Sequence, residues 1–325
     1  MQRRKLGNLE VSAIGLGCMS MTPIYGTPDP DEAIATIHRA LELGIDLIDT
    51  SDAYGAGKNE ELVGRALKDR RGKAVLATKF GNVRLPDGKP GANGDPAYAR
   101  ACCEASLKRL GVETIDLFYV HRIDRNVPIE DTVGELARLK EEGKIGHIGL
   151  SEASATTLRR AHATHPISAL QTEYSLWTRD PEAELLGVCE ELGVGWVAYS
   201  PLGRGFLTGT IGAVEDLGED DRRRQHPRFS ADNIAANSRL TATLGALAAA
   251  EGCSPAQLAI AWLLARAPFV VPLPGTKQRK WLEENVKALE LTLSPETLAK
   301  LDATFAPGAT AGLRYPAGQM ASVNV

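Results

Sequence analysis

IDLIDTSDAYG, residues 45–55, starts as an apolar strand, reaches a carboxylate at Asp49 and turns into a polar loop that carries Tyr54. The same arrangement recurs downstream, where Lys79 ends the apolar run of AVLATKFG and His121 follows that of IDLFYVHR. In a barrel of parallel strands, the side chains at the strand C-termini converge on one mouth. We therefore expect these four residues, which are far apart in sequence, to meet at one site.

Short apolar strands alternate with amphipathic helices along nearly the whole chain, which is typical of parallel βαβ units. After an expected hairpin of residues 3–6 and 11–13, the pattern predicts strands at 14–17, 46–50, 74–80, 116–121, 147–151, 169–174, 195–200 and 269–274. The matching helices are predicted at 30–43, 59–68, 96–110, 129–142, 155–165, 182–192, 254–267 and 277–289, with further helices at 237–251 and 295–304. Eight strand–helix units close a barrel. The prediction is a single α/β domain over residues 1–325, a (β/α)8 TIM barrel with an N-terminal β-hairpin and extra C-terminal helices and loops.

Two segments interrupt this alternation. Residues 206–233 are a long polar stretch, and loops of that length usually serve function or move. Residues 305–325, FAPGATAGLRYPAGQMASVNV, are rich in Gly, Pro and Ala. We expect this tail to act as a lid over the site or to be disordered.

The overall composition excludes several classes of protein. With 37 basic and 41 acidic side chains and a formal net charge of -4, the chain shows no basic footprint for nucleic acid or a membrane surface. Its five cysteines form no CxxC pair and are expected to be reduced. No signal peptide is evident, and no apolar run reaches the roughly 18 residues of a membrane span. We expect a cytoplasmic protein whose sequence specifies no oligomeric state.

The four strand-end residues suit proton transfer to a carbonyl oxygen. A phenol with a pKa of about 10 is a poor proton donor near neutrality, and we expect the ammonium of Lys79 to lower the pKa of Tyr54. Asp49 would keep Lys79 charged, and His121 would orient the carbonyl. Each residue alone has a structural interpretation, as a helix cap, a packed phenol, a strand-end charge or a core histidine. Their shared placement at strand ends favours catalysis.

A dinucleotide site is predicted at the mouth of the barrel. No G-x-G-x-x-G follows any predicted strand, which disfavours a Rossmann site. In YSPLGRGFLTG, residues 199–209, Gly203 and Gly205 permit close approach of a pyrophosphate. In PGTKQRKWLEEN, residues 274–285, Gly275 and Thr276 are expected to open a helix, with Lys277, Arg279 and Lys280 beside its positive end. Three cations at a helix N-terminus oppose the helix dipole, which favours a bound anion such as a 2'-phosphate.

The motifs LIDTSDAYGAGKNEELVGRAL, VLATKFG, DLFYVHR and IGLSEAS resemble those of the aldo-keto reductase superfamily, in its bacterial and plant branch with a short C-terminal region. The resemblance spans roughly residues 4–285. It implies that Asp49, Tyr54, Lys79 and His121 form a catalytic tetrad, with Tyr54 as general acid. It also implies an NADPH cofactor, whose contacts would be Ser151, Glu152, Gln171, Tyr199, Ser200, Leu202, Gly203, Gly205, Gly275, Thr276, Lys277, Glu284 and Asn285. Relatives often carry Asn at the position of Glu152.

The substrate is predicted to be a small-molecule aldehyde or ketone. Tyr25, Arg122, Trp177 and Phe206 lie in loops expected at the mouth, where aromatic side chains would suit an apolar or aromatic carbonyl compound. Two alternatives remain open. One is an NADPH-binding regulatory or sensor protein with little turnover, and the other is a lyase that uses Lys79 as a Schiff-base nucleophile. His162 and His165 have no evident third ligand, so we predict no metal site.

Overall fold

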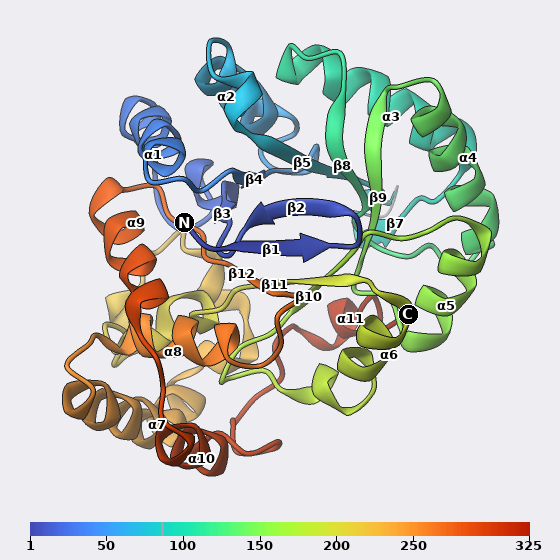
Figure 1. Ribbon diagram of the computed structural model, residues 1–325. Coiled ribbons are helices and arrows are strands. Elements are labelled where there is room, and N and C mark those ends of the chain that lie inside the picture. The colour runs from blue at the N-terminus through green and yellow to red at the C-terminus, as the bar shows by residue number, and fades with distance from the viewer. Residues whose placement is uncertain (86–87) are drawn as a thin grey trace.

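The computed structural model describes residues 1–85 and 88–325, in which eight parallel strands form one sheet rolled into a barrel (Figure 1). Neighbours in the sheet follow the order of the chain. The barrel strands are β3 (Leu16–Gly17), β4 (Leu47–Asp49), β5 (Val75–Phe80), β8 (Ile115–Val120), β9 (Ile145–Ser151), β10 (Ala169–Glu173), β11 (Gly195–Tyr199) and β12 (Val270–Leu273).

The first and last strands close the barrel. Gly17 forms a parallel bridge with Gly275, and the amides of Gly15 and Gly17 donate to the carbonyls of Pro272 (2.9 Å) and Pro274 (3.1 Å). A Cβ on Gly15 would lie 2.7 Å from the side chain of Leu273 and 3.0 Å from that of Leu47, so a larger residue would force these leucines to shift. The predicted (β/α)8 barrel is confirmed.

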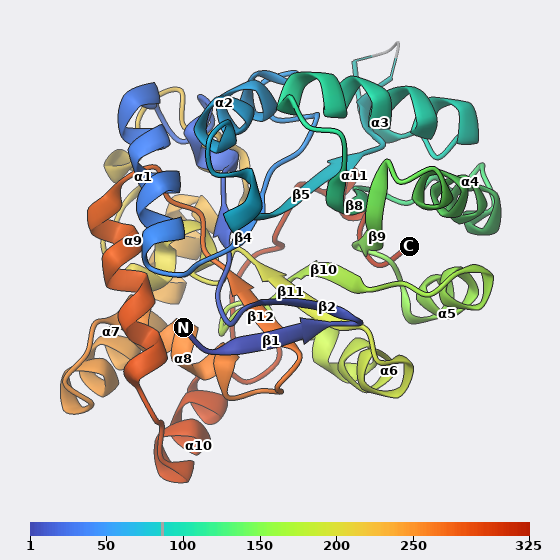
Figure 2. The same ribbon diagram turned by 45° about the horizontal axis from the view of Figure 1, so that its top comes forward.

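Helices surround the strands on the outside (Figure 2). They are α1 (Pro30–Glu42), α2 (Lys58–Leu67), α3 (Pro96–Leu110), α4 (Ile129–Glu141), α5 (Ala155–Thr164), α6 (Leu185–Leu192), α7 (Ala231–Ala250), α8 (Pro255–Leu264), α9 (Arg279–Val286), α10 (Pro295–Thr304) and α11 (Ala317–Met320). Several begin with a capping side chain followed by proline: Asp29, Asp95, Ser254 and Ser294 each accept a backbone N–H of the first turn. Such caps satisfy amides that have no partner inside the helix.

The barrel interior is filled by alternate residues of the strands. Because strand side chains point to opposite faces in turn, Val75 and Ala77 of β5 place Lys79 on the inner face as well. At the base, the hairpin of β1 (Arg3–Leu6) and β2 (Leu9–Ser12) lies across the end of the barrel (Figure 1). Its Leu6 and Val11 join the inner apolar cluster. The base is therefore plugged, and the polar ends of the strands face the other mouth.

Some boundaries differ from the sequence prediction. Helix α7 begins at Ala231, six residues earlier than predicted, because Ser230 caps it. Helix α9 begins at Arg279 because Gln278 is extended and serves as its N-cap. A small antiparallel hairpin of β6 (Asn82–Arg84) and β7 (Pro90–Ala92) was not predicted.

None of the helices in the described part of the chain is, by itself, both long and apolar enough to cross a bilayer. Helices α7 and α8 meet the criterion only when taken together, and they are bent by 85° at the break between them.

Candidate active site

A buried ion pair lies at the centre of the barrel mouth. The ammonium of Lys79, which is fully buried on β5, donates to the carboxylate of Asp49 at the end of β4. It also donates to the carbonyl of Thr50 (2.7 Å) and to the hydroxyl of Tyr54 (3.5 Å). Gln171 of β10 donates to the other carboxylate oxygen of Asp49 (2.9 Å). The structure thus brings Asp49, Lys79 and Tyr54 into one hydrogen-bonded group.

The protonation of Lys79 follows from its neighbours. Burial acts to lower the pKa of Lys79, but the charge of Asp49 and the hydrogen bonds to Asp49 and Tyr54 outweigh it and leave that pKa above its usual value. The ammonium is therefore retained, and it cannot act as a free amine nucleophile. This geometry disfavours the Schiff-base alternative.

The phenol of Tyr54 differs from our expectation. Burial raises the pKa of Tyr54, and the ammonium of Lys79 offsets that rise only in part. The predicted lowering of this pKa was wrong for the free protein, because the cost of burying a phenolate exceeds the attraction of one ammonium 3.5 Å away. Tyr54 is accordingly a neutral phenol with a proton to donate.

The imidazole of His121 is neutral. Burial lowers the pKa of His121 well below its usual value, and the nearby charges of Arg122 and Lys79 act in the same direction. Its ring stands edge-on to that of Tyr54, with centroids 5.9 Å apart and planes at 84°. The Nδ1 atom lies 3.0 Å from the hydroxyl oxygen of Ser51. His121 and Tyr54 together form one polar wall of the mouth.

A cavity of about 1120 Å³ opens above this group. It is large enough for more than one small molecule, since pockets for drug-sized ligands measure about 300–1,000 Å³. The predicted site residues that line it are Asp49, Tyr54, His121, Ser151, Gln171, Tyr199, Ser200, Leu202, Gly205, Gly275, Thr276, Lys277, Glu284, Asn285, Tyr25 and Arg122. Lys79 lies directly behind the wall, in contact with Asp49 and Tyr54.

Two predicted substrate residues do not line the cavity. Trp177 and Phe206 are buried and stack on one another with centroids 4.3 Å apart, and both rings pack edge-on against Phe229. Aromatic faces of this size gain more by excluding water against each other than by facing an open mouth. Their predicted pocket-lining position is therefore wrong.

Gly203 also has a packing role in place of the expected phosphate contact. It is not among the cavity-lining residues, and its φ is +56°. A Cβ at this position would lie 2.3 Å from the Trp177 ring. Gly203 lets the loop after β11 lie flat on that ring.

Glu152 lies beneath the mouth and does not line the main cavity. Its carboxylate forms a buried ion pair with Arg314 (3.3 Å) and accepts hydrogen bonds from the Tyr199 hydroxyl (2.7 Å) and the Glu173 amide (3.1 Å). Its φ of +55° is unusual for a residue with a side chain. Glu152 is thus held by the C-terminal tail in this structure.

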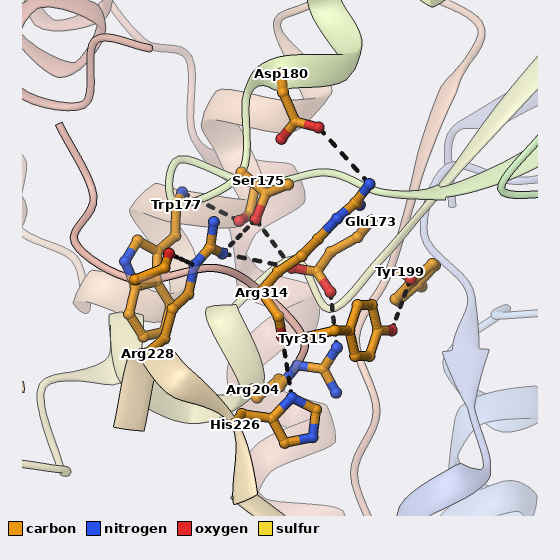
Figure 3. Close-up of polar contacts among 12 residues, drawn as sticks. Glu173, Ser175, Trp177, Asp180, Tyr199, Arg204, His226, Arg228, Arg314 and Tyr315 are labelled. Atoms are coloured by element: carbon orange, nitrogen blue, oxygen red, sulfur yellow. Dashed lines mark hydrogen bonds and ion pairs between the residues drawn. The ribbon is translucent and has the colours of Figure 1, made fainter. Parts of the chain in front are cut away.

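The C-terminal tail packs over the mouth. The hydroxyls of Tyr315 and Tyr199 lie 3.0 Å apart, and the guanidinium carbon of Arg204 lies 4.8 Å from the Tyr315 ring (Figure 3). His226 meets the backbone carbonyl of Arg314 through Nδ1 at 3.0 Å. Tyr315, Gln319 and Ser322 line the cavity. The sequence reasoning missed Arg314, since an arginine in a Gly- and Pro-rich tail carries no signal of its buried partner.

The cations around the start of α9 have different partners. Arg279 binds the carboxylate of Glu32 (2.8 Å), and the ammonium of Lys280 lies 4.4 Å from the centre of the Trp281 ring. Lys277 lines the cavity, where its ammonium donates to the carbonyls of Tyr25 (3.1 Å) and Gly26 (3.3 Å). The anion that we expected at this helix end is supplied for Arg279 by Glu32, so only Lys277 of the three cations faces the cavity.

The donor set of the cavity fits an anionic dinucleotide. Ser200, Arg204 and Gly205 have positive φ values of 52°, 59° and 95°, which turn the loop after β11 back on itself at the cavity wall. Ser20 lines the cavity near Gly275, and its hydroxyl oxygen is buried and has no hydrogen-bond partner among the described residues. A hydroxyl without a partner can donate a hydrogen bond to a ligand that carries acceptor atoms.

Comparison with known proteins identifies the family of this chain. The model of the aldo/keto reductase family matches residues 13–305, and the chain belongs to that family. The structure of glycerol dehydrogenase AKR11B4 from Gluconobacter oxydans is 32% identical with a TM-score of 0.85, covering 97% of this chain and 96% of that one. Aldo-keto reductase AKR11C1 from Bacillus halodurans, in its holo form, is 31% identical with a TM-score of 0.77, covering 94% and 96%. The thermostable aldo-keto reductase Tm1743, in complex with the inhibitor epalrestat, is 31% identical with a TM-score of 0.75, covering 94% and 100%.

Proposed function

We propose that this oxidoreductase reduces an aldehyde or ketone to the alcohol with NADPH, and that Tyr54 is the general acid. The observation that carries the proposal is the buried Asp49–Lys79–Tyr54 group beside a neutral His121 at the floor of a large cavity. A carbonyl oxygen placed between Tyr54 and His121 would meet two hydrogen-bond donors. Such donors stabilise the carbonyl oxygen most strongly when negative charge develops on it.

Each residue has a distinct part in proton delivery. Tyr54 gives its proton to the carbonyl oxygen as negative charge forms there. Lys79 stabilises the resulting phenolate through the 3.5 Å contact with the Tyr54 hydroxyl, and Asp49 keeps Lys79 charged. His121 donates a hydrogen bond that holds the carbonyl in place. The raised pKa of Tyr54 in the free protein ensures that the proton is present at neutral pH.

The nicotinamide cofactor, when bound, would supply the hydride. We expect Ser151 and Gln171 to hold the carboxamide, Tyr199 to face the ring and the loop of Ser200 to Gly205 to meet the phosphates. Glu284 and Asn285 at the end of α9 would contact the adenine. Lys277, as the cavity-facing cation of that region, supports a preference for NADPH over NADH.

The test is the oxidation of NADPH and of NADH, followed by absorbance, across aromatic aldehydes, short aldehydes, sugars, dicarbonyls and ketones. Turnover with NADPH that ranks these substrates would support the proposal. Absence of turnover with both cofactors, together with tight NADPH binding, would favour the sensor alternative.

Replacing Tyr54 tests the mechanism directly. Tyr54→Phe should lower kcat by about 10²–10⁴-fold, the usual contribution of a general acid. The Kd for NADPH, measured by fluorescence titration, should change little because the phenol is not among the expected cofactor contacts. An unaltered kcat would rule out Tyr54 as the proton donor.

A further inference from the structure

Arg122 directly follows His121 at the end of β8 and lines the cavity. One nitrogen, Nη1, donates to the carbonyl of His121 (2.7 Å) and to the hydroxyl of Ser151 (3.3 Å). In residues 1–85 and 88–325, no carboxylate forms an ion pair with this guanidinium, and its Nε and Nη2 make no hydrogen bond. The guanidinium of Arg122, which is always charged, therefore lies at the cavity wall without an anionic partner among these residues.

The neighbouring carboxylates are already taken by other arginines. Glu173 binds Arg204 (2.8 Å) and lies 3.5 Å from Arg228, as Figure 3 shows. Glu152 binds Arg314. Three guanidinium groups, those of Arg204, Arg228 and Arg314, thus already pair with these two buried carboxylates. Asp180, which lies 3.6 Å from Arg314, keeps a largely exposed side chain. Arg122 lines the cavity and has no carboxylate of the described residues left to pair with, and a charge of that kind is costly unless an anion reaches it.

We expect the phosphates of a cofactor at the loop of Ser200 to Gly205, which follows β11 three strands away from β8, and at Gly275 and Lys277. Gly275 and Lys277 follow β12, which is four strands away from β8 in a closed sheet of eight. They are therefore on the opposite side of the mouth from Arg122. The near neighbours of Arg122 are instead His121 and Ser151, close to where the carbonyl is expected.

We propose that Arg122 binds an anionic group on the substrate, so that the preferred substrates are short carbonyl compounds that carry a carboxylate or a phosphate. This inference rests on the proposed reductase activity. Nε and Nη2 offer the paired donors that match a carboxylate or phosphate edge. The adjacency of Arg122 to His121 places the anionic group a few bonds from the carbonyl.

The test compares anionic substrates with neutral analogues. Succinic semialdehyde is paired with butanal, 4-formylbenzoate with its methyl ester, and glyceraldehyde 3-phosphate with glyceraldehyde. We expect the wild-type kcat/KM to favour at least one anionic class by about 10-fold or more, and the third pair separates phosphate from carboxylate. In Arg122→Leu, kcat/KM for the favoured anions should fall about 10–100-fold, the range for a charge-assisted contact. The neutral partners should change by less than about 3-fold.

Two further variants keep the result interpretable. Arg122→Gln retains an amide donor for the His121 carbonyl and should fold if Arg122→Leu does not. Arg125→Leu removes an exposed arginine whose contact is the carbonyl of Ala321 (3.0 Å), and it should leave the anion preference intact. Equal rates on both members of every pair in the wild type would overturn the proposal. So would an equal loss on both members in Arg122→Leu and Arg122→Gln.

A binding measurement separates this inference from the reductase proposal. Titration calorimetry of 4-formylbenzoate and of inorganic phosphate, with and without NADP, does not depend on turnover. Binding that is lost in Arg122→Gln but kept in Arg125→Leu supports the anion site even if no substrate is reduced. Absence of binding of either anion in the wild type, under both conditions, overturns it.

Discussion

At the scale of single residues, the proton on His121 depends on Ser51. The Ser51 hydroxyl lies 3.0 Å from His121 Nδ1, and its oxygen accepts a hydrogen bond from the amide of Ala53 (3.2 Å). The hydroxyl hydrogen has three acceptors within reach: His121 Nδ1, Asp52 Oδ1 (3.2 Å) and the carbonyl of Lys79 (3.4 Å). Our proposal that His121 donates to the carbonyl requires the imidazole proton on Nε2, and in that tautomer the hydroxyl donates to Nδ1. In a neutral imidazole, the hydrogen bond made by one ring nitrogen sets whether the other nitrogen carries the proton. We therefore propose that Ser51 is a positioning residue for the donor that faces the carbonyl.

Ser51→Ala should lower kcat about 10-fold through loss of this orientation, with little change in the Kd for NADPH. Ser51→Thr keeps a hydroxyl and should recover most of the rate. Steady-state kinetics of the three proteins, together with the NMR shifts of the His121 ring nitrogens, would check both points. Equal kcat values for the wild type and Ser51→Ala would show that the contact does not orient His121.

Asp52 gives the fold a pH dependence. Burial, together with the nearby charge of Glu60, raises the pKa of Asp52 to about 7. In the unfolded chain the ordinary pKa is about 3.9, so between those values the folded state binds the extra proton. The stability associated with Asp52 is thus complete below pH of about 3.9 and is lost as the pH rises to about 7.

Asp52→Asn cannot ionise, so it should be more stable than the wild type at neutral pH. The difference in Tm should grow from pH 4.5 to pH 7 and then level off. Thermal unfolding across this pH range measures it, with Asp131→Asn on the exposed surface of α4 as a matched change. A difference that stays constant with pH would contradict a raised pKa for Asp52.

At the scale of strands and helices, most of the site was predictable because strand periodicity is local. Alternation along β4, β5 and β8 places Asp49, Lys79 and His121 on the inner face at one end of the barrel. The sequence gives no comparable indication for aromatic residues in loops, because Trp177 and Phe206 could either line a pocket or pack in the core. The partner of Glu152 was unpredictable for a different reason, because Arg314 lies 162 residues away in an irregular tail.

Strand β9 makes room for a large inward side chain on β8. A Cβ on Gly149 would lie 2.3 Å from the Tyr119 ring, which fills the barrel beneath Lys79. Gly149→Ala should therefore lower the free energy of unfolding by about 1–3 kcal/mol, as overpacking in a core does.

Urea unfolding would measure this cost. Gly134→Ala in α4 serves as the control, because a Cβ there meets no atom within 4 Å and alanine favours a helix. That variant should be unchanged or more stable by about 0.5–1 kcal/mol. Similar stabilities for both variants would mean that Tyr119 can move aside.

At the scale of the whole molecule, an ion pair and a backbone hydrogen bond hold the C-terminal tail against the barrel. Arg314 binds Glu152, and the amide of Ser154 donates to the carbonyl of Val325 (2.8 Å). The family model ends at residue 305, so these contacts come from the part of the chain beyond it. The tail thereby completes the wall of the cavity through Tyr315.

Arg314→Met should release the tail, because it leaves the buried carboxylate of Glu152 without its cation. Breaking a buried pair costs about 3–5 kcal/mol, which is more than the remaining tail contacts are expected to offset. Amide hydrogen exchange of residues 311–325 should then accelerate strongly, while the inner strands keep their protection. Arg125→Met, at the exposed contact with Ala321, is the control. Unchanged exchange in the tail of Arg314→Met would show that other contacts hold it.

The seam between β3 and β12 also bears on how the protein is made. Gly17 must pair with Gly275, which lies 258 residues later in the chain. At a synthesis rate of about 5–20 residues per second, a ribosome needs roughly 13–50 s to cover that distance. During this interval the outer edge of β3 lacks its neighbour, and open strand edges recruit other chains. We therefore expect any aggregation of this protein to be greatest on crowded polysomes, where nascent copies lie close together.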